Sequence, residues 1–134
     1  MARSKEIAEA FGVSLDQDDF ERCKTLLDAN CIYVIGDETL NGPTDIAGSY
    51  EANMIAGRRK LDKLEWGQSR IEALNDGTFF VHFTDYLTHK GEAYTHRCKQ
   101  RLTIEDNKVT RIEHIHDETE QQALNGYYKG VGLL

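Results

Sequence analysis

The residues best suited to chemistry are an aspartate and a histidine on two neighbouring predicted strands. Lys90-Gly91 separates two alternating runs, 78–89 and 92–105, and a two-residue hairpin loop fixes which residues face each other. This register places Asp85 opposite His96. Because side chains alternate along a strand, the pair shares one face with Phe79, Val81, Phe83, Leu87, His89, Glu92, Tyr94, Cys98, Gln100 and Leu102.

A carboxylate among apolar side chains is normally paired or protonated, because burying an unpaired charge is costly. An Asp–His pair in an apolar cavity orients the imidazole and moves its pKa towards neutrality. Asp85 and His96 are therefore candidates for a general acid/base dyad. The alternative, a satisfied polar pair in the core or at the wet end of the sheet, stays open.

The last predicted strand, 108–116, has two alternative registers. Strict alternation would turn Arg111 and Glu113 inwards. One bulge near 110–111 would instead turn Ile112, His114 and His116 inwards. We favour the bulge, since it keeps charged side chains out of the core. His114 would then lie beside Gln100 and His116 beside Cys98, which makes His114 a third catalytic candidate.

The pair His114-x-His116 also raises a metal hypothesis, because residues two apart on a strand point the same way. With Asp85 or His96 they would form a three-ligand site. Two histidines alone are weak evidence, so we expect neither a metal nor an organic cofactor. The sequence shows no nucleophile elbow and no glycine-rich phosphate loop, which argues against a serine hydrolase or a nucleotide enzyme.

Aromatic residues with a polar tip suit a pocket that is apolar yet orients its ligand. On this basis we expect a small apolar ligand. The candidate ligand-binding residues are Tyr33, Tyr50, Trp66, Tyr94, Cys98, Gln100, Ile112 and His116.

The predicted elements are helices followed by an antiparallel meander. Helices are expected over 5–11, ended by Gly12, then from Ser14 or Asp16 to Ala29, and from Pro43 to near 57. Short strands are expected at 31–35 and 39–40, long strands at 63–74, 78–89, 92–105 and 108–116, and a last helical stretch at 118–128. This order predicts one α+β domain over 1–134, with N-terminal helices packed on a strongly curved antiparallel sheet that forms a cone around an internal pocket.

Composition narrows the class of protein. A formal charge of −7 over 134 residues argues against a nucleic-acid partner. No apolar run approaches the roughly 18 residues of a membrane span, and the first twelve residues lack the apolar core of a signal peptide. Three widely spaced cysteines are expected to stay reduced. We therefore expect a cytoplasmic protein with neither nucleic-acid nor membrane partners.

Three segments resemble the SnoaL-like group of the nuclear transport factor 2-like superfamily. They are LLDANCIYVIGDETLNGPTDIAGSY, GTFFVHFTDYLTHKGEAYTHRCKQRLTIED and DNKVTRIEHIHD. The resemblance implies a cone-shaped α+β fold around a hydrophobic cavity, with dimerisation through the outer sheet face. Members include polyketide cyclases, ketosteroid isomerases, dehydratases, epoxide hydrolases and non-catalytic binding modules. Asp117 matches the acidic residue that SnoaL-like cyclases use, but the favoured bulge turns it away from the cavity.

Three functions remain in competition. The first is a cofactor-independent lyase or isomerase that moves a proton on a small apolar carbonyl-like compound, with His114, Tyr94 or Gln100 bonding the oxyanion. The second is a non-catalytic small-ligand-binding module, and the third a protein-interaction domain acting through the outer sheet face. Under all three we expect a homodimer, since Phe80 and Tyr86 would otherwise be exposed on that face.

Overall fold

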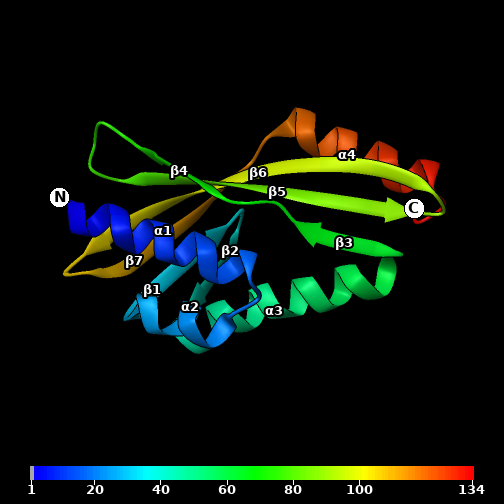
Figure 1. The fold of residues 1–134 in the computed structure, drawn as a ribbon. Coiled ribbons are helices and arrows are strands. Elements are labelled where there is room, and N and C mark those ends of the chain that lie inside the picture. Colours follow the sequence, from blue (N-terminus) through cyan, green and yellow to red (C-terminus); the bar gives the residue numbers. More distant parts are fainter. Residues whose placement is uncertain (1) are drawn as a thin grey trace.

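The computed structural model describes residues 2–134, and its centre is an open, curved sheet of seven strands (Figure 1). The sheet order is β2-β1-β7-β6-β5-β3, and β4 also pairs with β5. Only β1 and β7 run parallel; the other pairs are antiparallel. The strands are β1 (Leu27–Ile35), β2 (Glu38–Asn41), β3 (Lys63–Trp66), β4 (Arg70–Ala73), β5 (Phe79–His89), β6 (Glu92–Glu105) and β7 (Lys108–Ile115).

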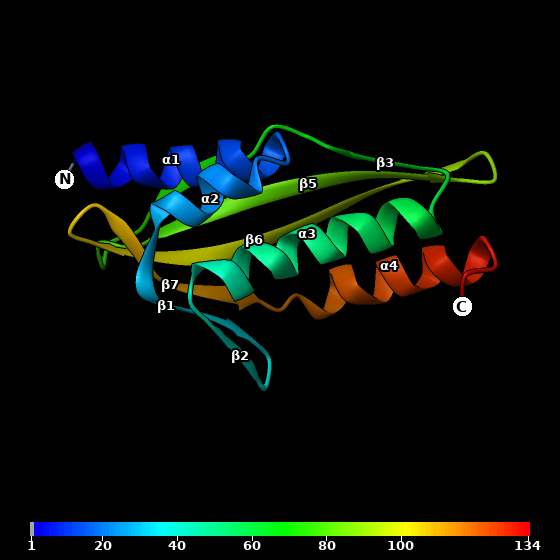
Figure 2. The same cartoon turned by 90° about the horizontal axis from the view of Figure 1, so that it is seen from below.

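Three helices, α1 (Ala2–Asp16), α2 (Phe20–Leu26) and α3 (Pro43–Lys60), cover one face of the sheet. The fourth, α4 (Glu118–Gly130), runs beside the end of α3 (Figure 2), where Lys60 Nζ lies 4.2 Å from the ring centre of Tyr128. Helices on one face of a mostly antiparallel sheet confirm the predicted α+β class. Across the described residues, no helix combines the length and apolarity needed to cross a membrane.

The long β5–β6 hairpin has the register predicted from its loop. Lys90 and Gly91 both have positive φ angles, 51° and 80°, as a two-residue hairpin turn of this kind requires. Asp85 pairs with His96, and the pairing continues without a shift from His89–Glu92 to Phe79–Leu102. All the candidate residues of these two strands therefore share the face that the helices cover.

The bulge expected in the last strand is present. Ile104 pairs with Val109 but Thr103 pairs with Arg111, so Thr110 is the extra residue. Ile112 is fully buried and His114 lies opposite Gln100, as predicted. The strand ends at Ile115, however, and His116 has no strand partner. The expected place of His116 beside Cys98 in the sheet is therefore wrong.

The helix boundaries near the N-terminus differ from those predicted. Gly12 does not end α1, which continues to Asp16. A Cβ at Gly12 would collide with Ser69 Oγ, so this glycine allows α1 to approach the chain between β3 and β4 closely. The second helix is short: Asp19 caps its N-terminus by accepting a hydrogen bond from Arg22 N. The first strand then begins at Leu27 rather than at residue 31.

The strand predicted over 63–74 is two strands that share β5 as a partner. β3 pairs with its second half and β4 with its first half. Between them, Gly67 N still donates to Thr84 O at 2.8 Å, but Ser69 N donates to Asp16 Oδ2 at 2.9 Å. Because Ser69 bonds to α1 instead of the sheet, the ladder breaks there. The glycine at 67 also leaves room for the Tyr86 ring.

The core has a large and a small part. The large cluster joins α1, α2 and α3 to the sheet around Phe11, Ile46, Val81, Leu102 and Ile112. The small cluster lies at the other end of the long hairpin, where residues of α4 pack against its buried leucines Leu61, Leu64 and Leu87. Between these two apolar clusters lies the part of the inner face that carries Asp85.

Gly12 and Gly48 form a matched pair for testing the close approach of α1. Alanine favours a helix interior by about 1 kcal/mol over glycine. Nothing lies within 4 Å of a Cβ at Gly48 in α3, so Gly48→Ala should raise the free energy of unfolding by about 0.5–1 kcal/mol. Gly12→Ala should lower it by about 1–3 kcal/mol, because Ser69 must move. Urea unfolding of both variants measures this, and a stabilising Gly12→Ala would contradict the packing argument.

Candidate functional site

A cavity of about 290 Å³ lies between the inner face of the sheet, the α1–α2 junction and α3. Its size is at the lower end of small-molecule pockets, which span roughly 300–1,000 Å³. Most of its wall is apolar or aromatic. The lining residues are Leu15, Asp16, Asp18, Phe20, Tyr33, Ile35, Tyr50, Asn53, Met54, Trp66, Phe83, Thr84, Asp85, Cys98, Gln100 and His114.

Seven of the eleven residues proposed from the sequence line this cavity. They are Tyr33, Tyr50, Trp66, Asp85, Cys98, Gln100 and His114. Ile112 is fully buried in the core behind them. The side chain of His116 is 61 % exposed and pairs with Glu118 at 2.8 Å. Tyr94 and His96 lie beyond the cavity, towards α4.

Asp85 is the carboxylate that meets the apolar part of the cavity. Burial raises its pKa to about 6, and the nearby His96 opposes part of that rise. A carboxyl group with this pKa exchanges protons close to neutral pH, which is the property required of a general acid or base. The cause is desolvation, because β5 holds the group between two apolar clusters.

His96 takes a different partner from the one predicted. Its Nδ1 lies 3.3 Å from Glu120 Oε2 in α4, although the two are not aligned as a hydrogen bond. One ring nitrogen also lies within 4.8 Å of a carboxylate oxygen of Asp85, and no hydrogen bond joins Asp85 and His96 in the described chain. The direct dyad is therefore replaced by an imidazole between two carboxylates, of which only Asp85 lines the cavity.

Two further groups beside Asp85 are held in their neutral forms. Burial, together with the charges of Asp85 and Glu120, raises the pKa of the Cys98 thiol to about 12. Burial and the neighbouring His116 and His96 lower the pKa of His114. Cys98 is thus a poor nucleophile at neutral pH, and His114 presents an uncharged imidazole to the cavity.

The opposite wall carries a chain of hydrogen bonds. Tyr50 donates its hydroxyl proton to Gln100 Oε1 at 2.6 Å, and Gln100 Nε2 donates to the Tyr33 hydroxyl oxygen at 2.8 Å. The two tyrosine rings stack with their centres 5.3 Å apart. Burial raises the pKa of Tyr33 to about 12, so its hydroxyl keeps its proton. The Tyr33 O–H is the last donor in this series of hydrogen bonds. Because hydrogen bonds in series polarise one another, such a donor is strengthened.

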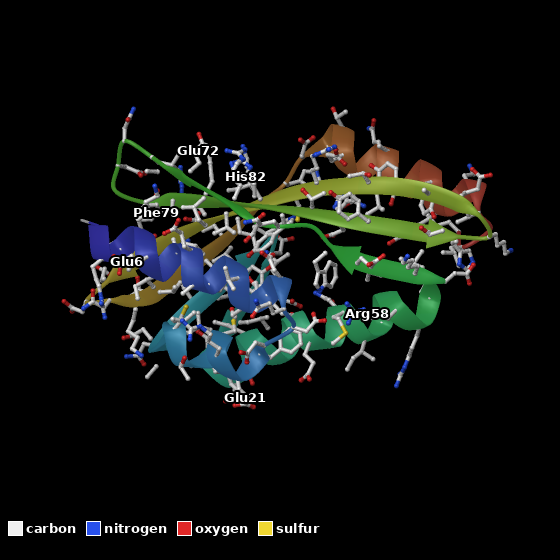
Figure 3. All side chains as sticks on the ribbon, in the orientation of Figure 1. Glu6, Glu21, Arg58, Glu72, Phe79 and His82 are labelled. Atoms are coloured by element: carbon white, nitrogen blue, oxygen red, sulfur yellow. The ribbon has the colours of Figure 1, made fainter. Side chains whose placement is uncertain are left out.

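The carboxylate of Asp18 holds the Trp66 side chain in the wall of the cavity. Asp18, with a positive φ of 55°, accepts from Trp66 Nε1 at 2.7 Å and from Arg58 at 2.8 Å. Arg58 comes from α3 and points towards β3 (Figure 3), where its guanidinium lies 5.5 Å from the Trp66 ring centre. Both oxygens of Asp18 are therefore used in positioning the indole.

Asp16, Asp18 and Glu120 were not predicted from the sequence as residues of the site. Asp18 lies in a turn between two helices, and no local pattern links it to a tryptophan 48 residues away. Glu120 lies in a helix whose packing direction is not encoded locally. A polar residue on the sheet-facing side of that last helix was the one available signal.

Asp85, His96 and Cys98 also form a mixed donor set, with one donor atom of each within 4.8 Å of the others. Carboxylate, imidazole and thiolate are the ligand types of zinc sites, in which each donor lies about 2.0–2.3 Å from the ion. Binding of Zn²⁺ would require Cys98 to lose its proton, which its raised pKa opposes.

The raised pKa of Asp85 predicts a stability penalty above pH 4. A carboxyl group that binds its proton more tightly when folded destabilises the protein as pH rises from its unfolded pKa to its folded one. Moving from 3.8 to about 6 corresponds to about 3 kcal/mol at pH 7. Relative to wild type, Asp85→Asn should therefore gain up to about 3 kcal/mol of unfolding free energy between pH 4 and pH 7. Urea unfolding across this range measures the difference, and a pH-independent difference would contradict it.

Comparison with solved structures gives matches over nearly the whole chain, whereas no family model and no curated protein matches it. A candidate polyketide cyclase from Pseudomonas putida KT2440 has TM-score 0.65 and 18 % identity, covering 88 % of this chain and 94 % of that one. TerC co-crystallised with polyporic acid has TM-score 0.68 and 20 % identity, covering 91 % and 97 %.

An LEH-like epoxide hydrolase from M. tuberculosis has TM-score 0.66 and 18 % identity, covering 95 % of this chain and 93 % of that one. At these identities the likeness concerns the fold and not the activity. It agrees with the resemblance noted in the three sequence segments, which span β1 to β7. The chain therefore shares the α+β fold of these solved structures.

Proposed function

We propose that the protein is an acid/base enzyme that moves a proton on a small, neutral, carbonyl-like compound held in the cavity, as an isomerase, cyclase or dehydratase would. Asp85 is the group that takes and returns the proton. The observation that carries the proposal is the placement of this carboxyl group, with its pKa of about 6, in the wall of an apolar cavity. A catalytic base is most effective when its pKa lies near the working pH.

The hydrogen-bond chain supplies the second group that such a reaction needs. Removing a proton beside a carbonyl places negative charge on its oxygen, and a preorganised donor stabilises that charge. The Tyr33 hydroxyl is such a donor, since Gln100 and Tyr50 hold it in place. Gln100 was proposed from the sequence to bond the oxyanion directly, and here it serves through Tyr33 instead.

The charges around the cavity favour a neutral ligand. None of its lining residues is Lys or Arg, whereas three are aspartates. Two of these are already compensated: Asp18 by Arg58 and Trp66, and Asp16 by the backbone N–H and hydroxyl of Ser69 at 2.9 and 2.8 Å. A carboxylate or phosphate on the ligand would find no cation and would face Asp85.

A simple bicyclic ketone, 1-tetralone, tests both binding and proton transfer. Trp66 is the only tryptophan of the chain and lines the cavity, so its fluorescence reports binding. In D₂O the enzyme should exchange the α-protons of tetralone for deuterium, as followed by NMR. Asp85→Asn should still bind the ketone but exchange its protons at least about 100-fold more slowly, the usual contribution of a general base.

One further variant and two analogues sharpen this test. Tyr33→Phe should weaken binding of tetralone but not of tetralin, which lacks the oxygen. The anion 1-naphthoate should bind poorly to wild type. Binding without any exchange above buffer would refute the proton-transfer proposal and favour a non-catalytic ligand-binding module. Unchanged exchange in Asp85→Asn would assign the base to another residue.

The outer sheet face supports a homodimer as part of the proposed organisation. Tyr86 is 49 % exposed there, and Phe80 is flanked by Lys99 and Arg101, at 4.4 and 5.6 Å from its ring. On the same face His82 pairs with Glu72 at 2.7 Å (Figure 3). Aromatic side chains among cations provide an anchor for a second copy with a polar rim.

A charge placed among these outer-face aromatic side chains tests whether the protein forms the proposed dimer. Tyr86→Glu should shift wild-type dimer to monomer in sedimentation equilibrium, because a buried carboxylate opposes association. The variant should still bind tetralone, since Tyr86 does not line the cavity. A wild-type protein that stays monomeric at all concentrations would contradict the proposal, as would a dimer that is unaffected by the substitution.

A further inference from the structure

A second hollow of about 300 Å³ lies between the start of α4 and the part of β6 beyond the end of β7, and residues from both faces of the sheet line it. Its lining is far more polar than that of the cavity. The residues are His82, His96, Arg97, Cys98, Lys99, His114, Ile115, His116, Asp117, Glu120 and Gln121. Cys98 and His114 line both spaces, so one layer of side chains separates the groove from the cavity. We refer to this second hollow as the α4 groove.

His96 occupies the position between the two spaces. One of its nitrogens lies within 4.8 Å of the Asp85 carboxylate, a distance that one water or a small side-chain movement spans. Its Nδ1 lies 3.3 Å from Glu120 Oε2. Asp85 lines the cavity and not the groove, whereas Glu120 lines the groove and not the cavity.

The Nδ1 atom of His96 is buried and has no hydrogen-bond partner among the described residues, although a carboxylate stands beside it. An orphaned buried nitrogen costs stability and calls for an explanation. The neighbouring carboxylate is itself fixed, because Glu120 Oε2 accepts from the Tyr94 hydroxyl at 3.0 Å. Tyr94 in turn stacks on Tyr127 of α4, with the ring centres 5.3 Å apart.

We propose that Asp85, His96 and Glu120 form a proton path, with Glu120 as the group that exchanges protons between the enclosed site and solvent in the α4 groove. The inference rests on the proposed function of Asp85 and adds a positioning and exchange role for a residue outside the cavity. It explains why an imidazole is held between two carboxylates instead of in a simple pair.

The steps conserve protons and charge. The Asp85 carboxylate takes a proton from the substrate carbon and becomes a carboxylic acid. That acid gives its proton to the imidazole of His96, and the imidazolium releases a proton from Nδ1 to the Glu120 carboxylate. Glu120 passes it to water in the groove, and the reverse sequence delivers a solvent proton to Asp85. No bond other than those to hydrogen is formed or broken.

Other titratable groups near this path are less suited to the exchange. Cys98 keeps its proton, with its pKa raised to about 12. His116 is engaged by Glu118 at 2.8 Å on the solvent side. Of the carboxylates at the cavity, Asp16 and Asp18 are bonded to Ser69, Trp66 and Arg58.

Glu120→Gln is the decisive variant, because glutamine retains the oxygen that accepts from Tyr94 but cannot carry the proton. At saturating 1-tetralone the variant should exchange deuterium about tenfold or more slowly than wild type, with the affinity reported by Trp66 unchanged. Imidazole added to the buffer should restore part of the rate by serving from the groove, and Glu120→Asp should restore part of it as well. Glu118→Gln, on the same helix, is the matched control and should exchange at the wild-type rate.

A second measurement does not depend on turnover. In protein labelled with ¹⁵N in its histidines, the ring N–H of His96 should exchange with water more slowly in Glu120→Gln than in wild type. If neither this exchange nor the deuterium rate changes, the path through Glu120 is wrong, while Asp85 keeps its role.

If wild type and Asp85→Asn exchange tetralone no faster than buffer, the proposed function fails. The His96 N–H measurement then decides the path alone: slower exchange in Glu120→Gln supports it, and unchanged exchange overturns it. A tetralone exchange rate that EDTA abolishes and Zn²⁺ restores would overturn the path in favour of a metal held by Asp85, His96 and Cys98.

Discussion

The left-handed turn at Lys90 and Gly91 sets the register on which the candidate site depends. Because side chains alternate, a slip of one residue in β6 relative to β5 would turn Gln100 to the outer face and bring Arg101 inwards. The wall that joins cavity and groove would then lose Cys98 as well. Eleven residues of β6, from Glu92 to Leu102, pair with β5 in this one register, and the bulge at Thr110 adjusts β7 so that His114 joins the same face.

The position of Asp85 in the sheet explains both why its charged form destabilises the fold and why the group suits proton transfer. Its neighbours along the inner face are Phe83 and Leu87, and apolar clusters lie on either side of it. Desolvation therefore raises its pKa, and the fold bears that penalty at neutral pH. A purely structural polar pair would avoid the penalty by direct hydrogen bonding. Asp85 instead faces the cavity and has no hydrogen-bonded partner of opposite charge among the described residues, as a group that must accept a substrate proton would.

The features that could be predicted from the sequence are those that local rules determine. Turn chemistry and alternation gave the Asp85–His96 register, and the cost of burying Arg111 and Glu113 indicated the bulge. Long-range packing decided the rest. Gly12 carries the signal of a helix end, but contact with Ser69 makes it an interior glycine of close approach. Glu120 reaches His96 only because α4 folds back along β6, and nothing near residue 120 encodes that direction.

One layer of side chains separates an apolar cavity from a charged groove, and the proposed reaction depends on this separation. The cavity holds aromatic rings and a single uncompensated carboxyl group, whereas the α4 groove holds cations, histidines and Glu120. A neutral ligand can therefore be enclosed in the apolar space, where hydrogen bonds and charges act strongly. Enclosure has a cost, since a base covered by its ligand loses contact with water. In the proposed path, the imidazole of His96 restores that contact, because it lies near Asp85 of the cavity and beside Glu120 of the groove.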